Sequence, residues 1–195
     1  RITLVDHDNV ELSNLQRQIA HTTSDVGCKK VESAKRSLIA INPHTEVLTI
    51  DHILEKEDYN EILPNIDIIV DATDNFESRF FINKQSLRHK KPLVSGAAIR
   101  LEGQVSVFNV DESSPCYGCL YNPDTRTPTE SCSDSGVIAP LLGIIGSIQA
   151  LETLKLIIGF GENLGGRLLL LDSRSMEWHS VLLKKDPKCP ACGSN

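Results

Sequence analysis

Four of the six cysteines form two C-x-x-C pairs, "CYGC" at residues 116–119 and "CPAC" at residues 189–192. A pair with this spacing in a tight turn points two thiolates at one ion, so two pairs complete the tetrahedral coordination that Zn²⁺ prefers. A redox pair, two disulfides or plain buried thiols are the alternatives, but a redox pair normally opens a helix in an early βα unit, whereas these pairs lie among prolines and glycines. We therefore expect a closed structural zinc site, formed by Cys116, Cys119, Cys189 and Cys192.

A further cysteine, Cys132, lies alone in the polar segment "TESCSDSGV", just before a long apolar run. A thiol at the N-terminus of a helix is more readily deprotonated, which would suit a nucleophile. A surface cysteine without a role in chemistry is equally compatible with this spacing. Cys28, in "DVGCKKVE", is more simply explained as incidental.

Polar residues also follow the first apolar segment of the chain. Asp6 ends the β-rich run "RITLV", where a Rossmann-type site holds a ribose hydroxyl, although a strand-end aspartate often only caps the next turn. The segment "SNLQRQ" contains Asn14, Arg17 and Gln18, and Lys30 is expected one turn into a helix. Arginine and lysine at these positions can neutralise phosphates, whereas each taken singly is more often a solvated surface charge.

Two carboxylates end a later strand. "DIIVDAT" is a short β-rich run, and the overlapping "DATDN" places Asp71 and Asp74 at its carboxyl end. Ligands of open α/β sheets bind at this edge, and a carboxylate beside a polyphosphate is suited to Mg²⁺.

The elements that position these residues alternate between strand and helix. Strands are expected at residues 1–5, 46–50, 67–73 and 92–98, and helices at 31–41 and 76–90, the first of them stopped by Asn42-Pro43. We expect the first and third of these strands to be buried and parallel. Beyond Arg100, antiparallel strands are expected at 102–110, 166–172 and 176–185. This order predicts an α/β fold, a Rossmann-like doubly wound mixed sheet with antiparallel C-terminal strands and a zinc-binding tail.

Bulk properties limit the classes of function. The 195 residues, 40% of them hydrophobic, suffice for one core and predict a single domain over 1–195. A net charge of −6 without a Lys/Arg block argues against nucleic acid or an anionic membrane as partner. The apolar run 137–160 contains Glu152 and Lys155, so we expect a buried core helix with Pro140 near its start and not a membrane span. Six cysteines without a signal-peptide pattern favour a reducing compartment, the cytoplasm.

Seven segments of the chain carry a resemblance to a known family: "LVDHDNVELSNLQRQ", "VGCKKVESA", "DATDNFESR", "LVSGAAIRLEGQVSVF", "PCYGCL", "GVIAPLLGIIGSIQALETLK" and "CPACG". In this order they resemble the ThiF/MoeB/HesA family, the bacterial relatives of ubiquitin-activating E1 enzymes. The resemblance implies an adenylyltransferase that uses ATP and Mg²⁺ to adenylate the C-terminal glycine of a ubiquitin-like sulfur carrier ending in Gly-Gly. It also implies a homodimer with one structural zinc per subunit. The carrier is ThiS-like, for thiamine biosynthesis, or MoaD-like, for molybdenum cofactor biosynthesis, and the sequence does not choose between them.

The resemblance also assigns roles to residues. It gives the ATP ribose to Asp6, Mg²⁺ to Asp74 and zinc to the four paired cysteines. Cys132 occupies the place of the cysteine implicated in sulfur transfer, or in a covalent link to the carrier, in ThiF-type members, while related cysteines are dispensable in some MoeB-type members. The phosphates fall to Asn14, Arg17, Gln18 and Lys30, and catalysis to Arg17, Lys30, Asp74 and Cys132.

One family motif does not occur in the chain. The glycine-rich phosphate loop, G-x-G-G-x-G between a first strand and helix, should precede "RITLVD". Because the sheet would otherwise lack its usual first strand, we expect a fragment from which the first strand, glycine loop and helix are missing. Two other interpretations stay open. One is a non-catalytic zinc-stapled module that binds a ubiquitin-like tail, and the other is a nicotinamide dehydrogenase, which has no use for Arg17, Lys30 and Asp74 as a set.

Overall fold

The computed structural model describes residues 1–121 and 136–193, so Cys132 lies outside the described residues. The chain divides into two compact units, Arg1–Tyr59 and Asn60–Asn195, which we call unit 1 and unit 2. The organisation of residues 1–195 as a single domain stays a prediction.

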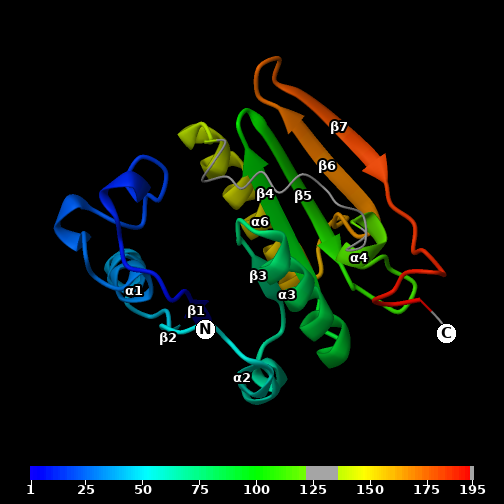
Figure 1. Ribbon diagram of the computed structural model, residues 1–195, viewed down its shortest axis with the longest axis horizontal. Helices are drawn as coiled ribbons and strands as arrows, with labels where there is room; N and C mark the ends of the chain where they lie inside the picture. The colour runs from blue at the N-terminus through cyan, green and yellow to red at the C-terminus, as the bar shows by residue number, and fades with distance from the viewer. Residues whose placement is uncertain (122–135, 194–195) are drawn as a thin grey trace. The chain divides into compact units, whose positions relative to one another are not determined.

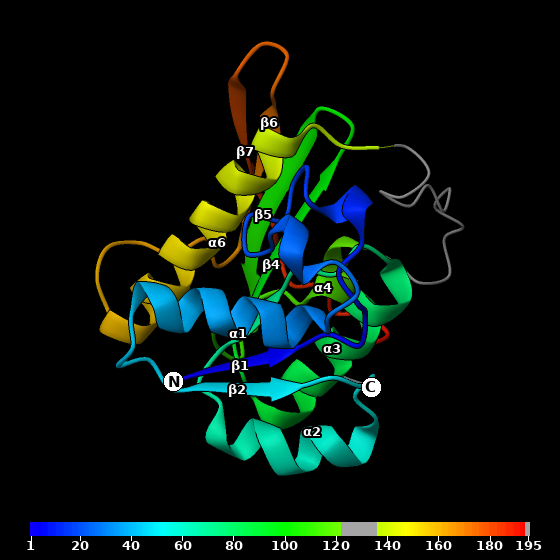
Figure 2. The ribbon, with the colours of Figure 1, turned by 90° about the vertical axis from the view of Figure 1, so that its left-hand side faces the viewer.

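Unit 1 is built around a pair of parallel strands, β1 (Ile2–Val5) and β2 (Val47–Ile50), on which α1 (Lys30–Ile41) packs (Figure 2). Two short 3₁₀ helices, Leu12–Asn14 and Thr23–Asp25, lie in the connection from β1 to α1. The helix ends before Asn42-Pro43 as predicted, since proline disfavours the helical conformation of the residue before it.

Two expectations for unit 1 are wrong. Lys30 is the first residue of α1 and does not lie one turn into it. The residues before it do not join the helix, because their backbone groups form hydrogen bonds with Val10. The strand β1 is not buried: its residues are exposed or half-buried, since in this structure it belongs to a sheet of only two strands.

Unit 2 contains a five-stranded mixed sheet with the order β3-β4-β5-β6-β7 (Figure 1). The pair β3–β4 is parallel, as predicted, but the expectation that β3 is buried is wrong: it is an edge strand in which Val70 is exposed and Asp71 is buried. Every later pair is antiparallel, as predicted for the segment beyond Arg100. An α/β fold with a mixed sheet is therefore confirmed, but the described strands belong to two sheets and not to one. The strands are β3 (Ile69–Asp71), β4 (Leu93–Ile99), β5 (Glu102–Phe108), β6 (Arg167–Asp172) and β7 (Glu177–Leu182). The helices are α2 (Lys56–Ile62), which crosses the boundary between the units, the 3₁₀ helix Leu63–Asn65, α3 (Phe76–His89), α4 (Tyr117–Leu120) and α6 (Ala139–Ile158).

The sheet of unit 2 has a hydrophobic cluster on each face. Successive residues of a strand point to opposite faces, so Leu93 and Val94 of β4 belong to different clusters. Val94 packs with Leu141 and Ile145 of α6, whereas Leu93 packs with Tyr117 of α4 and with side chains of α3. Consequently α6 covers one face, and α3 and α4 cover the other (Figure 1).

The long helix α6 is a core helix on one face only. By length and composition it could cross a membrane, and 22% of its apolar window is buried. Its opposite face is exposed and apolar at Leu154, Ile157 and Ile158, so the expectation of a buried helix is right for one face and wrong for the other. The buried face carries Leu141, Ile145, Gln149 and Glu152.

Candidate functional site

The loop between β1 and α1 closes on itself at its two ends. Val10 donates its backbone N–H to the carbonyl of Cys28 at 2.8 Å, and Gly27 donates to the carbonyl of Val10 at 2.8 Å. The N–H of Lys30 bonds the carbonyl of Asp8 at 3.0 Å. The first residue of α1 is thereby brought beside the residues that follow β1.

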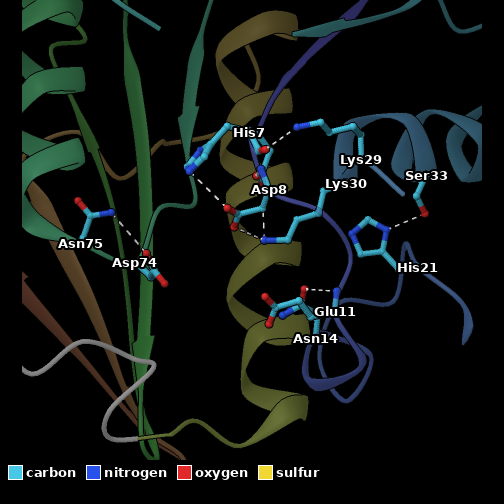
Figure 3. Close-up of polar contacts among 11 residues, drawn as sticks. His7, Asp8, Glu11, Asn14, His21, Lys29, Lys30, Ser33, Asp74 and Asn75 are labelled. Carbon is cyan, nitrogen blue, oxygen red and sulfur yellow. Dashed lines mark hydrogen bonds and ion pairs between the residues drawn. The ribbon is translucent and has the colours of Figure 1, made fainter. Parts of the chain in front are cut away.

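This closure brings Asp6 and Lys30 together and adds Asp8, which the sequence analysis did not single out. Figure 3 shows the Lys30 side chain at the Asp8 carboxylate. The Lys30 ammonium lies 2.6 Å from a carboxylate oxygen of Asp8 and 3.8 Å from one of Asp6. The hydrogen bond from Lys30 lowers the pKa of Asp8. Ligand atoms of Asp6, His7 and Asp8 lie within 4.8 Å of one another, a spacing that a cation can bridge, although Lys30 already neutralises part of the charge.

The next turn carries the three other predicted phosphate ligands of unit 1. Asn14 is buried, and its side-chain oxygen accepts the N–H of Glu11 at 3.0 Å, so it fixes the turn (Figure 3). Arg17 donates to the carbonyl of Ser13 at 3.0 Å and is half-buried. The buried side-chain oxygen of Gln18 has no hydrogen-bond partner among the described residues, a costly state that a donor from outside the chain would relieve.

In unit 2, the turn between β3 and α3 separates the roles of the two predicted carboxylates. Asp71 is 1% exposed, and its carboxylate accepts the backbone N–H of Thr73 at 2.9 Å and the Thr73 hydroxyl at 2.7 Å. Asp74 is exposed, and the side chain of Asn75 lies beside it (Figure 3). Asn75 caps α3 by accepting the N–H of Ser78 at 2.8 Å. Of the two carboxylates, Asp74 is therefore the one accessible to a ligand.

The four paired cysteines meet in unit 2. Their sulfurs lie within 4.8 Å of one another, with separations of 3.7 Å for Cys116–Cys189, 3.9 Å for Cys116–Cys119 and 3.4 Å for Cys119–Cys192. A disulfide needs about 2.05 Å, so the interpretation as two disulfides does not match this geometry. Four thiolates around one Zn²⁺ at about 2.3 Å would be separated by about 3.8 Å, and the observed sulfurs fit that arrangement.

The surroundings of the cluster affect how a cation would bind. Burial raises the pKa of Cys116 to about 11, so a bound metal ion would have to displace the proton of this thiol. The backbone N–H of Asp186 donates to the Cys119 sulfur at 3.4 Å, a contact that stabilises a thiolate. A side chain at Gly193 would place its Cβ 2.6 Å from the carbonyl oxygen of Cys189, so only glycine allows the second knuckle to fold this tightly.

Sequence reasoning missed three residues of these sites: Asp8, Arg79 and Gln149. Asp8 is a second aspartate, two positions after Asp6. The signal that could have identified it is Lys30, a cation close to the start of the next helix that needs an acidic partner. Gln149 follows the buried Ile145 by four residues in an apolar helix, a spacing that indicates a buried polar side chain with a specific partner. The contacts of Arg79 and Gln149 lie at the Asp71–Asp74 turn.

Known proteins are similar to this one over almost the whole length of the chain. The ThiF family model matches residues 1–191. The chain is similar to the molybdopterin-synthase adenylyltransferase of Haemophilus influenzae, 47% identical over 182 residues that cover 93% of this chain and 74% of the relative. The protein of the same name from Escherichia coli (strain K12) is 40% identical over 195 residues, 98% of this chain and 77% of the relative. The crystal structure of E. coli MccB has a similar fold, with a TM-score of 0.84 at 24% identity over 99% of this chain and 58% of that chain.

Proposed function

The chain belongs to the ThiF family and is an adenylyltransferase of the E1-like ThiF/MoeB type, and from this premise we propose that it adenylates a ubiquitin-like sulfur carrier of the MoaD type. The carrier's C-terminal glycine carboxylate and ATP would be the substrates, for molybdenum cofactor biosynthesis. The observation that carries the proposal is the similarity, over 93% and 98% of this chain, to two molybdopterin-synthase adenylyltransferases. A ThiS-like carrier, for thiamine biosynthesis, is the second candidate.

The proposed reaction asks the chain mainly for position and charge. A carboxylate oxygen of the carrier attacks the α-phosphorus of ATP, the bond from that phosphorus to pyrophosphate breaks, and the acyl-adenylate forms. Stabilisation of the charge on the phosphates supplies most of the acceleration in such reactions. Lys30, held at the end of β1 by Asp8 and Asp6, and the half-buried Arg17 are the cations of unit 1 that would supply it.

The remaining nucleotide contacts follow from the donor and acceptor groups of the chain. The Asp6 carboxylate would accept the ribose hydroxyls, and Asn14 and Gln18 would contact the phosphates. The unpaired buried oxygen of Gln18 supports a partner from outside the described residues. In unit 2, the exposed Asp74 is an oxygen ligand of the type that Mg²⁺ prefers, and bound Mg²⁺ would supply positive charge beside the phosphates.

The cysteine cluster is proposed to hold one structural Zn²⁺. Four protein sulfurs close the coordination, so no position is left for a substrate. The ion would join α4 to the C-terminal segment and thereby stabilise that part of unit 2. The proposal is supported by the spacing of the sulfurs and by the donors that face them.

The role of Cys132 and the homodimer have less support than the rest of the proposal: the first rests on the family resemblance alone, and the second on one surface feature. A role for Cys132 in sulfur transfer stays a prediction, because the residue lies outside the described residues. A homodimer is supported by the exposed apolar face of α6, a surface that assembly would remove from water.

Exchange of label between pyrophosphate and ATP tests the proposed function in the full-length protein. We expect exchange that depends on a MoaD-like carrier and is weaker or absent with a ThiS-like one. Exchange with the ThiS-like carrier alone would assign the protein to thiamine biosynthesis. No exchange with either carrier, in a folded zinc-loaded protein, would favour a non-catalytic module that binds a ubiquitin-like tail.

A further inference from the structure

The turn that carries Asp74 is held by a buried arginine. Arg79, in the first turns of α3, is 7% exposed, and both its Nε and its Nη2 donate to the carbonyl oxygen of Thr73, at 3.2 and 2.6 Å. A guanidinium fork usually pairs with a carboxylate or a phosphate. Here its two hydrogen bonds go to the one carbonyl that directly precedes Asp74.

A second buried side chain holds the other end of the same turn. Gln149 of α6 is 5% exposed and donates its amide N–H to the carbonyl of Asp71 at 2.8 Å. The amide fits because residue 96 is glycine: a Cβ there would lie 2.3 Å from the Cδ of Gln149. The hydroxyl of Ser95 adds a hydrogen bond to the Asp71 carboxylate at 3.3 Å.

Side chains from α3 and α6 therefore converge on the backbone of the turn that carries Asp74, and Ser95 of β4 bonds the Asp71 carboxylate in the same turn. The buried polar groups fix Asp71 and Thr73, and the Asn75 cap fixes the residue that follows Asp74. An exposed carboxylate on a mobile turn would have to be ordered each time a ligand binds. A turn held by buried hydrogen bonds presents the carboxylate already in place.

We propose that Arg79 is a positioning residue for Asp74, and that its two hydrogen bonds to the Thr73 carbonyl fix the carboxylate for binding the divalent metal of the metal–nucleotide complex. This inference rests on the proposed function, because it assigns Arg79 to the metal ligand of that site. Lysine cannot replace Arg79 here, since its single ammonium does not reproduce the planar fork.

The test is direct metal binding by the full-length protein. Mn²⁺ is titrated by electron paramagnetic resonance in the presence of a non-hydrolysable ATP analogue, with wild type and Arg79→Lys. We expect the variant to bind Mn²⁺ about tenfold more weakly, as is typical when a group that orients a metal ligand is lost. Binding of the analogue without metal should stay within about twofold, because Arg79 is not proposed to touch the nucleotide.

Two further variants make the test specific. Gly96→Ala displaces the Gln149 amide and should weaken Mn²⁺ binding in the same direction, even if Arg79→Lys fails to fold. Arg167→Lys is the matched control. Arg167, the first residue of β6, also donates from its guanidinium to a backbone carbonyl, that of Asn163, at 3.2 Å. The control should bind Mn²⁺ like wild type.

The outcomes separate this inference from the proposed function. Wild-type Mn²⁺ affinity in a folded Arg79→Lys variant would overturn the inference and leave Arg79 a structural residue. If Arg79→Lys does not fold, Arg79→Gln replaces it in the same titration, and wild-type Mn²⁺ affinity in that variant would overturn the inference. A wild-type protein that neither binds Mn²⁺ with nucleotide nor catalyses exchange would overturn the proposed function, and the inference with it.

Discussion

Asp71 and Asp74 lie three positions apart in one turn, and their surroundings give them different tasks. The buried Asp71 is occupied by Thr73 and Ser95, so replacing it would leave buried donors without an acceptor. Asp74 is exposed, and its side-chain contact is with the neighbouring Asn75 at 3.4 Å. A metal role can therefore be tested at Asp74 without disturbing the fold.

We expect Asp74→Asn to slow carrier-dependent pyrophosphate exchange by about 10²-fold, the effect of losing one preorganised electrostatic group. Its thermal midpoint should match wild type, because the side chain is exposed. Asp67→Asn is the matched control, an exposed aspartate just before β3, at the opposite end of the same strand. Equal exchange rates in both variants would remove Asp74 from the mechanism.

At the scale of elements, α4 and the C-terminal segment depend on each other. The helix α4 has four residues, too few to be stable alone, and it begins directly after Cys116. Its Tyr117 packs against Phe80 of α3 and Phe108 of β5, at centroid distances of 5.4 and 5.7 Å. The cysteine cluster therefore joins the C-terminal segment to an aromatic cluster on the sheet.

Removal of zinc with a chelator should loosen this part of unit 2. If removal of the ion lowers the free energy of unfolding by about 3 kcal/mol, the thermal midpoint of a chain this long falls by roughly 6–12 °C. Hydrogen exchange should rise at residues 116–120 and 186–193 and change little in α6. Metal analysis should give one zinc per chain in wild type and in Cys28→Ser, and a loss in Cys189→Ser. A zinc-free wild type with an unchanged midpoint would contradict the structural site.

A pH-sensitive contact joins the 3₁₀ helix Thr23–Asp25 to the middle of α1. Hydrogen bonds from the backbone and hydroxyl of Thr22, and an ion pair with Arg36 of α1, hold the pKa of Asp25 well below its usual range. A lowered carboxyl pKa contributes stability above the unfolded pKa of about 3.9, and this contribution is lost as the pH falls through the folded pKa.

Asp25→Asn should therefore be less stable than wild type at pH 7, and the difference should shrink as the pH falls below about 4. Urea unfolding midpoints of both proteins across this pH range provide the measurement. A difference that does not depend on pH would show that the ionised form of Asp25 is not what stabilises the loop.

At the scale of the whole molecule, strong local signals predicted most elements. The run "PLVSGAA" became β4, and the apolar spacing of 31–41, with proline after it, became α1. The helix α2 was not predicted, because its sequence, "KEDYNEI", is short and polar, and α4 was missed because only tertiary contacts hold it. Local sequence therefore predicted the elements whose apolar spacing and end signals are strong, and it missed those that depend on tertiary contacts.

The candidate sites were predicted only in part, because some of their features depend on contacts between residues far apart in the sequence. Residue types and spacing indicated the four cysteines, and the structure brings their sulfurs together. Sequence could not distinguish Asp71 from Asp74, because the burial of Asp71 depends on Ser95, 24 residues later. The pairing of Lys30 with Asp8 likewise depends on a loop that closes over 22 residues. Long-range contacts decide which polar residues stay accessible.

Adenylation is the central claim, and the residues proposed to support it are Arg17, Lys30 and Asp74. The most direct test is the intact mass of a MoaD-like carrier after incubation with ATP, Mg²⁺ and the full-length protein. We predict a carrier whose mass has increased by one adenylyl group, located on its C-terminal glycine and absent without ATP. A carrier of unchanged mass, under conditions in which the protein binds both ATP and the carrier, would contradict the account.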